Sequence, residues 1–391
     1  MRTTLMNARL LTPDEEIVDG AVVIEDRNIL YAGHVDGAPG EKGSVHDVQE
    51  RCITPGFIDI HVHGAEGSSF IAFEADADVL ESYSCYAAAR GVTGFLTSVA
   101  FADHAGYMRA CKAYPSLFEK GVSGAEPLGI HLEGPFLSLE KKATFPAHWL
   151  RKPSTDEMAE MLEAADGWIK QMTLAPELPG AEEVARQCVE AGVVVALGHS
   201  NASYETAAKA LAGRWTNITH MYNAMSGLHH REPGVVGAVL HSHDCYAELI
   251  PDGVHVHPAA MRLMVERLGT DRVILITDAT MVAGLPEGEH DVGDVHIIVR
   301  DGVARIPAGN LAGSTIEMNR CVANACSLLG ASMQEAVRMA STNPARMLGL
   351  DQRLGRLEEG MDASLVVLEE NADVALTMVN GAIVYDTGVA G

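Results

Sequence analysis

Between residues 55 and 350 the chain alternates strand-like apolar runs with helix-like stretches, and this alternation constrains the fold more than any other feature. The apolar runs are short and rich in Val, Ile and Leu, as in GVTGFLTSVAF, VVVALGHS and RVILITDAT. Such runs separated by helices are typical of parallel sheets built from β-α-β units. About eight units fit a (β/α)8 TIM-like barrel better than a doubly wound sheet. Residues 285–308 interrupt the pattern, and we expect a β-hairpin insertion there.

The two ends of the chain differ from this central part. Residues 1–54 and 351–391 contain short alternating runs separated by Gly, Asp and Asn, a pattern typical of strands and turns. We therefore expect the two ends to pair into one small β-sandwich domain, with the barrel of residues 55–350 inserted between them. The predicted fold class is α/β.

Charge and cysteine content limit the partners and the compartment. The chain has 53 acidic and 28 basic residues, giving a formal net charge of −25, which disfavours nucleic acid and anionic membranes but allows a small phosphorylated ligand. Its seven cysteines form no CxxC pair, so neither a disulfide framework nor a thiolate zinc site is indicated. The first residues lack an apolar signal core and no apolar run reaches roughly 18 residues, so we expect a cytoplasmic protein.

Several residues that could bind a metal share one position in the pattern, because each lies at or just beyond the end of a strand-like run. They are His61, His63, Glu133, His199, His220 and Asp278. In a TIM-like barrel the active site lies at the carboxyl ends of the strands, so these side chains would meet. Imidazole nitrogens and carboxylate oxygens suit a divalent metal. Each histidine alone is more often a hydrogen-bonded core residue, but the set together predicts a hydrolytic metal site.

Two of these positions allow a closer interpretation. His61 and His63 are two residues apart on a strand, so their side chains face the same side and could share one metal. Asp278 could be a further ligand, a partner of a histidine, or a general acid/base. Hydrolysis needs a group that accepts a proton from water and donates one to the leaving group, which favours the last role.

A series of motifs extends this interpretation to a known family. The motifs PGFIDIHVHG, HLEGPFL, GHS, THMYNAMSG, REPG, DGVH, TDA and LAGST occur in this order. The chain resembles the amidohydrolase superfamily and, within it, the N-acetylglucosamine-6-phosphate deacetylases, over nearly its whole length. The resemblance implies metal-dependent hydrolysis of the acetamide of N-acetylglucosamine 6-phosphate to glucosamine 6-phosphate and acetate.

The resemblance also implies roles for the metal-site residues. Glu133, His199 and His220 would hold the principal metal, and Asp278 would be the catalytic acid/base. Because His61 and His63 are both present, a second metal could bind there with Glu133 as a bridge. One or two metals per subunit are therefore expected, with zinc as the first choice and iron, cobalt or manganese as alternatives.

The substrate-binding residues implied by the resemblance are Thr144, Asn223, Ala224, Arg231, His255, Leu311, Ala312 and Gly313. Arg231 and His255 would bind the phosphate, for which a guanidinium is well suited. In relatives the phosphate-binding arginine reaches in from a neighbouring subunit, so the resemblance implies a homodimer.

One position departs from the family pattern. Phe145 stands where the family usually has a histidine that contacts the acetamide; whether His148, three residues further on, takes over this contact stays open. Because phenylalanine cannot donate a hydrogen bond, N-acetylgalactosamine 6-phosphate or another N-acyl sugar phosphate stays an alternative substrate. A cyclic amidohydrolase, which would not need Arg231 and His255, and a non-catalytic scaffold are more distant alternatives.

Overall fold

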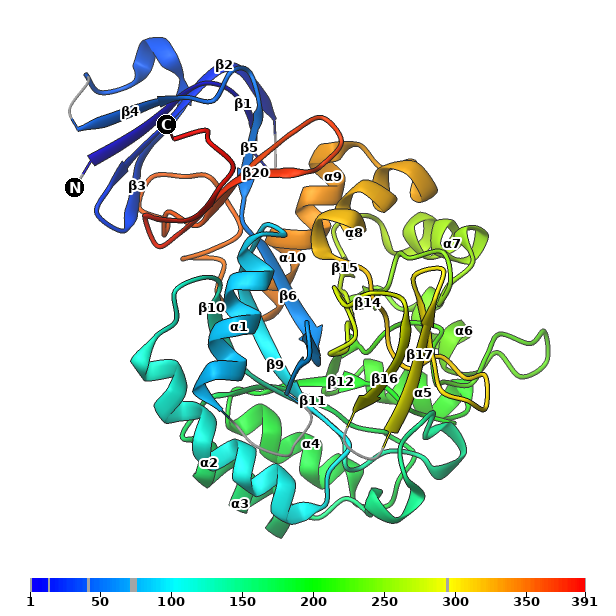
Figure 1. The fold of residues 1–391 in the computed structure, drawn as a ribbon. Coiled ribbons are helices and arrows are strands. Elements are labelled where there is room, and N and C mark those ends of the chain that lie inside the picture. The colour runs from blue at the N-terminus through cyan, green and yellow to red at the C-terminus, as the bar shows by residue number, and fades with distance from the viewer. Residues whose placement is uncertain (1, 13–14, 41–42, 71–75, 293–294, 391) are drawn as a thin grey trace.

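Eight short strands form the centre of the large domain in the computed structural model, which describes residues 2–12, 15–40, 43–70, 76–292 and 295–390 (Figure 1). They are β6 (Phe57–Val62), β9 (Val92–Val99), β10 (Glu126–Glu133), β11 (Ile169–Thr173), β12 (Val194–Leu197), β13 (Trp215–Ile218), β14 (Ala247–Leu249) and β15 (Val273–Leu275). Six pair in parallel in the order β13-β12-β11-β10-β9-β6, and β14 pairs in parallel with β15. Backbone hydrogen bonds from Tyr246 N to Thr216 O and from Asp278 N to His61 O, both 2.9 Å long, join the two sheets at their two seams. The predicted TIM-like barrel is therefore confirmed.

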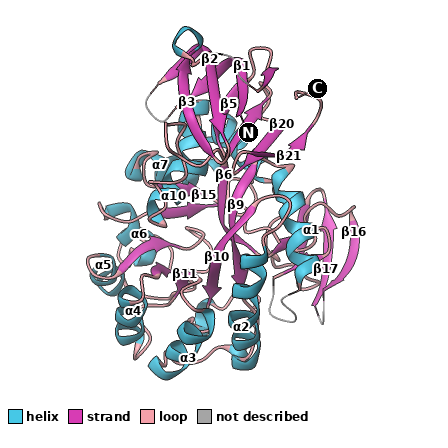
Figure 2. Cartoon of the chain, turned by 90° about the vertical axis from the view of Figure 1, so that its left-hand side faces the viewer, coloured by secondary structure: helices cyan, strands magenta, loops and turns pink. Residues whose placement is uncertain are grey.

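Helices follow the barrel strands and pack around their outside (Figures 1 and 2). In α4 (Ala181–Glu190) the buried residues Ala181, Val184, Ala185 and Cys188 recur at the spacing of one helix face, which explains how this helix packs on the barrel. None of the helices within the described ranges combines the length and the apolar character needed to span a membrane. The other helices are α1 (Ala77–Ala88), α2 (His104–Lys120), α3 (Thr155–Ala165), α5 (Tyr204–Leu211), α6 (Gly234–His241), α7 (Pro258–Leu268), α8 (Met318–Asn324), α9 (Met333–Val337) and α10 (Asn343–Met347).

Both ends of the chain contribute to a separate strand-rich domain, at the top of Figure 2. Its strands follow the order β21-β20-β19-β5-β1-β2-β3, with β4 paired to β1. The two ends are joined within the sheet by the antiparallel pair of β19 and β5, in which Leu365 lies opposite Pro55. Leu5, Ile53 and Leu365 belong to one buried apolar cluster of this domain. The strands are β1 (Arg2–Leu11), β2 (Glu16–Glu25), β3 (Asn28–His34), β4 (Ser44–Asp47), β5 (Cys52–Pro55), β19 (Leu365–Leu368), β20 (Val374–Val379) and β21 (Ala382–Asp386).

The fold is thus a TIM-like barrel with a small β-sandwich domain built from both chain ends, as predicted. The boundaries at residues 54 and 351 stay a prediction.

The insertion after β15 contains one strand more than the expected hairpin. β16 (Gly288–Val292) pairs antiparallel with β17 (Val295–Arg300), and residues 293–294 lie outside the described residues. β18 (Val303–Arg305) then pairs antiparallel with β17. The turn between them, Asp301-Gly302, has φ values of 52° and 69°, a conformation that the Asp-Gly sequence favours in two-residue hairpins. The insertion is a three-stranded sheet because this second turn signal lies within the segment.

Candidate metal centre

The six residues predicted for the metal site meet at the carboxyl ends of the barrel strands. His61 lies in β6 and Glu133 is the last residue of β10, whereas His199, His220 and Asp278 follow β12, β13 and β15. The backbone of the last three is left-handed, with φ values of 46°, 28° and 47°. Such a conformation costs a non-glycine residue about 1 kcal/mol or more and marks functional sites. Here it turns the chain sharply at the point where each strand ends.

Glu133, His199 and His220 form the first group of potential ligands. The Oε1 atom of Glu133 lies 3.0 Å from His199 Nε2 and 3.1 Å from His220 Nε2, and the two ring nitrogens are 3.0 Å apart. His199 Nδ1 donates a hydrogen bond to Lys141 O at 2.9 Å, which leaves its Nε2 lone pair directed at this group. Two imidazole nitrogens this close need a cation or a shared proton between them. The donor set therefore fits a divalent metal.

His61, His63 and Glu133 form the second group. His63 Nε2 lies 3.3 Å from Glu133 Oε2 and 3.3 Å from Asp278 Oδ1, and His63 Nδ1 donates to Ser98 O at 3.0 Å. His61 Nε2 lies 3.5 Å from Glu133 Oε1 and is a buried nitrogen without a hydrogen-bond partner among the described residues. An orphaned nitrogen that faces two carboxylates fits a second metal position, and Glu133 belongs to both groups.

The charges of the site influence one another strongly. Burial disfavours a charge on His63, but the hydrogen bonds that its ring donates to Asp278 and Glu133 outweigh this effect and raise the pKa of His63 to about 9. Burial would raise the pKa of Asp278, but the charges of His61 and His63 lower it to about 2. The pKa of Glu133 is likewise held well below its usual range, chiefly by His61 against the effect of burial. Both carboxylates are therefore ionised at neutral pH.

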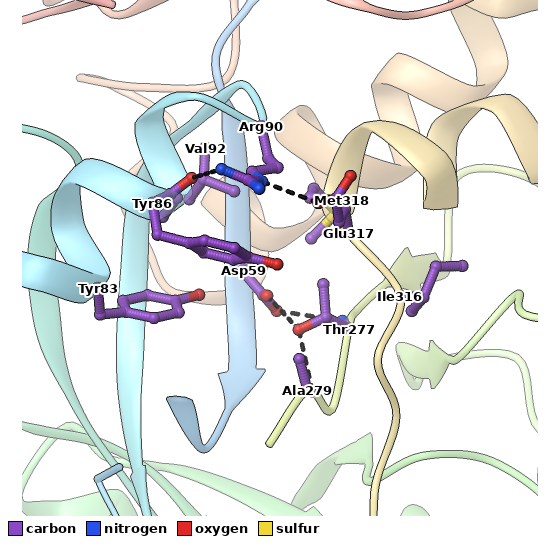
Figure 3. Close-up of a pocket in the computed structure, with 11 residues that line it drawn as sticks. Asp59, Tyr83, Tyr86, Arg90, Val92, Thr277, Ala279, Ile316, Glu317 and Met318 are labelled. Atoms are coloured by element: carbon purple, nitrogen blue, oxygen red, sulfur yellow. Dashed lines mark hydrogen bonds and ion pairs between the residues drawn. The ribbon is translucent and has the colours of Figure 1, made fainter. Parts of the chain in front are cut away.

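A third buried carboxylate, that of Asp59, is hydrogen-bonded to Thr277 (Figure 3). Asp59 of β6 accepts a hydrogen bond from Thr277 Oγ1 at 2.6 Å, and its other oxygen accepts from His61 N at 3.3 Å and Thr277 N at 3.4 Å. Burial raises the pKa of Asp59 to about 7, although the bonds from Thr277 oppose this. Because Thr277 precedes Asp278, these bonds fix the distance between the strand with His61 and the segment with Asp278.

Sequence analysis missed three buried polar residues that surround the site: Asp59, Glu248 and His131. His131 lies two residues before Glu133 on β10 and contacts Ser98 Oγ at 2.9 Å and Thr173 Oγ1 at 2.8 Å. Burial holds its pKa well below the usual range, so the ring is neutral. The available signal was a polar residue inside an apolar run, as in IDIHV, GIHLE and AELI.

The predicted substrate-binding residues of two loops lie next to the metal groups. Asn223 donates to His220 O through both its backbone N, at 3.0 Å, and its side chain, at 3.2 Å. The loop with Leu311, Ala312 and Gly313 is held by a bond from Ser314 N to Asp278 O at 2.9 Å. Gly313 has a φ of 64°, and a Cβ there would lie 2.4 Å from Thr280 Cγ2, so the loop needs glycine for this close approach.

Ala224 also lies beside the metal groups. Its carbonyl oxygen accepts a hydrogen bond of 3.2 Å from the backbone N of Ser200, the residue that follows His199. Thr144 is half-buried and precedes Phe145.

The two predicted phosphate-binding residues lie in different environments. Arg231 is exposed and donates to His230 Nε2 at 2.7 Å, so it does not join the buried groups of its own chain. His255 is mostly buried and bonds to Asp252 Oδ2 at 2.6 Å. Burial lowers the pKa of His255, but Asp252 and, more weakly, Asp278 raise it above its ordinary value. His255 is therefore within electrostatic reach of the metal centre.

An aromatic pair replaces a hydrogen-bonding group on one side of the centre. Phe145 is buried and stacks on Phe101 with ring centroids 4.0 Å apart, and its ring edge meets His199 at 5.3 Å. His148, the substitute considered above, is exposed and packs against Trp149 instead. This side of the centre is apolar.

With this geometry in hand, the comparison with known proteins is decisive. Residues 52–384 match the amidohydrolase family. The chain belongs to this family. It is 39% identical to the N-acetylglucosamine-6-phosphate deacetylase of Vibrio furnissii over 86% of this chain and 84% of that one. It is 35% identical to the N-acetylgalactosamine-6-phosphate deacetylase of Escherichia coli O157:H7 over 98% of this chain and 99% of that one.

A solved structure has the same amidohydrolase fold throughout. It is a mutant N-acetyl-D-glucosamine-6-phosphate deacetylase from Mycobacterium smegmatis in complex with N-acetyl-D-glucosamine-6-phosphate, with a TM-score of 0.90 and 33% identity over 98% of this chain and 99% of that one.

The charges of the centre predict how the metal-free amidohydrolase responds to pH. The folded-state pKa of His63, about 9, lies above the ordinary value of about 6.5. Its stabilising effect is therefore complete below pH ~6.5 and is lost as the pH rises through ~9. We expect the Tm of the chelated protein to fall over this window. Thermal unfolding of the chelated wild type and of chelated His63→Gln checks this. The Tm of the variant should fall less over this pH window than that of the wild type. A wild-type Tm that stays constant or rises would contradict the charge arrangement.

Proposed function

We propose that this amidohydrolase hydrolyses the acetamide of N-acetylglucosamine 6-phosphate to glucosamine 6-phosphate and acetate, in amino-sugar metabolism. One observation carries the proposal: Glu133 is shared by two histidine pairs at the barrel mouth, with Asp278 beside it. The relatives with this fold over nearly the whole chain are sugar-phosphate deacetylases, which supplies the substrate class. Zinc is the first choice for the metal, with iron, cobalt or manganese as alternatives.

Glu133, His199 and His220 would hold the principal metal, and His61 and His63 a second one. A bound divalent metal supplies Lewis acidity, which makes water a better nucleophile and the acetamide carbonyl a better electrophile. Three of the four histidines, His61, His63 and His199, are suited to this task because a hydrogen bond from Nδ1 fixes the orientation of each ring before any metal binds. His63 and His199, for example, are anchored by backbone carbonyls.

Asp278 is the proton carrier in this proposal. Its low pKa means that it starts as a carboxylate and can accept a proton from the attacking water. It then donates that proton to the sugar nitrogen as the C–N bond breaks, so that water and amide become acetic acid and amine, which are present as acetate and ammonium at neutral pH. Its side chain is 13% exposed whereas that of Glu133 is 4% exposed. Asp278 is therefore the carboxylate that a substrate can reach.

The phosphate end of the substrate would be bound by His255 and Arg231. His255 lies within reach of Asp278 and carries a raised pKa, which favours the charged form that attracts a phosphate. Arg231 points out from its own chain, a position that suits a contribution to the site of a second subunit in a homodimer. The sugar would be contacted by Asn223, Ala224, Thr144 and the loop 311–313.

This chain departs from the family pattern at the end of the site that would hold the acetyl group. With Phe145 stacked on Phe101, the carbonyl oxygen receives no hydrogen bond from position 145. Its polarisation would depend on the metal, and the methyl group of the acetyl would meet an apolar wall. The galacto epimer stays the second candidate because one close relative acts on it. A scaffold role is disfavoured because every predicted ligand position carries a side chain that can bind a metal.

Replacing Asp278 tests the mechanism. Asp278→Asn keeps the size of the side chain but removes the proton acceptor, so acetate release should fall by at least about 100-fold. Metal content and Tm should stay near those of the wild type, which serves as the control for folding. A variant with wild-type kcat would show that the proton carrier is another group.

The substrate is tested by assaying the two epimers side by side. We expect a higher kcat/KM for N-acetylglucosamine 6-phosphate than for N-acetylgalactosamine 6-phosphate, measured as acetate release by the zinc-loaded protein. A higher value for the galacto compound would overturn the preferred substrate and retain the reaction.

A further inference from the structure

A buried carboxylate, Glu248, contacts the metal centre without belonging to either group of ligands. It is the middle residue of β14 and is completely buried between two apolar neighbours, Ala247 and Leu249. An ionised carboxylate is costly in such a place unless hydrogen bonds satisfy it. The hydrogen-bond partners of Glu248 therefore indicate its role.

Four N–H groups, from residues in or just after the three barrel strands β6, β11 and β13, surround Glu248. Its Oε1 accepts from Gln171 Nε2 and from Asn217 Nδ2, both at 2.8 Å. Its Oε2 accepts from His61 Nδ1 at 2.9 Å and from the backbone N of His220 at 3.1 Å. Each oxygen thus accepts two hydrogen bonds. Oε2 contacts one residue from each group of potential ligands, His220 from the first group and His61 from the second.

The bond to His61 distinguishes this histidine from its neighbours. His63 and His199 donate their Nδ1 protons to neutral carbonyls of Ser98 and Lys141, whereas His61 donates to a charged group. Because a carboxylate accepts only, the proton of His61 stays on Nδ1. Nε2, which lies 3.5 Å from Glu133 and 3.6 Å from Asp278, is then the nitrogen that would give up its proton to a metal. A carboxylate behind a histidine also makes that histidine a stronger metal ligand.

We propose that Glu248 is the positioning residue that determines whether the second metal position, at His61 and His63, is filled. It does so by fixing the orientation and the tautomer of His61 and by placing a negative charge behind the ring. The principal position depends less on Glu248, because Glu248 touches only the backbone of His220 and makes no bond to His199. The inference rests on the proposed metal-dependent function and concerns the occupancy of one position.

The test is a stepwise zinc titration of Glu248→Gln. This variant keeps the size and one accepting oxygen but removes the charge. Protein stripped with a chelator is titrated with Zn²⁺ against a competing indicator, and bound metal is counted by mass spectrometry. We expect the wild type to bind two equivalents. In Glu248→Gln the tighter step should persist and the weaker one should lose about 10- to 100-fold in affinity.

Two further variants separate positioning from simple stability. Gln171→Met removes a donor from the other oxygen of Glu248 and should lower the Tm while leaving both zinc affinities unchanged. Glu248→Asp keeps the charge but shortens the reach, so it should weaken the same second step even if Glu248→Gln does not fold.

Several results would overturn the inference. These are unchanged affinities in Glu248→Gln and Glu248→Asp, an equal loss at both steps, loss of the second step in Gln171→Met, or a single equivalent in the wild type. Failure of the proposed function would appear differently, as fully loaded wild-type protein that releases no acetate from any N-acyl sugar phosphate.

Discussion

Four histidines converge on the carboxylate of Glu133, and the rest of the site is arranged around this contact. Its Oε1 faces His199 and His220, and its Oε2 faces His63. The carboxylate is almost completely buried, so its charge needs positive partners, which protonated histidines or bound metal can provide. The same four rings can hold protons or metal but not both, which makes metal binding in this protein a competition with protons.

The barrel makes this arrangement rigid through contacts outside the ligand set. Asp59 links the strand of His61 to Thr277, next to Asp278, and Glu248 links His61 to the backbone of His220. Both carboxylates lie within strands, below the positions where the ligands point out of the barrel. Polar groups in the barrel core therefore set the geometry of the centre, and the loops above it hold the residues proposed to contact the substrate.

The sequence predicted the barrel, and it predicted which candidate ligands come together at the strand ends, because both depend on local patterns. Apolar runs followed by His, Glu or Asp place those side chains at strand ends, and strand ends of a barrel meet. Glu248 and Asp59 could not be recognised in this way, because their roles come from partners far away in sequence, such as His61 for Glu248 and Thr277 for Asp59. The third strand of the insertion was missed because β18 has only three residues. Phe145 was noticed, but its stacking on Phe101 depends on a fold that brings residues 101 and 145 together.

The central claim is that one shared metal centre performs the hydrolysis. The most direct measurement is acetate release from a panel of N-acyl sugar phosphates by the same preparation before chelation, after chelation and after addition of zinc. Activity on N-acetylglucosamine 6-phosphate should disappear with the bound metal and return with zinc. Undiminished acetate release by protein that has been shown to contain no metal would contradict it.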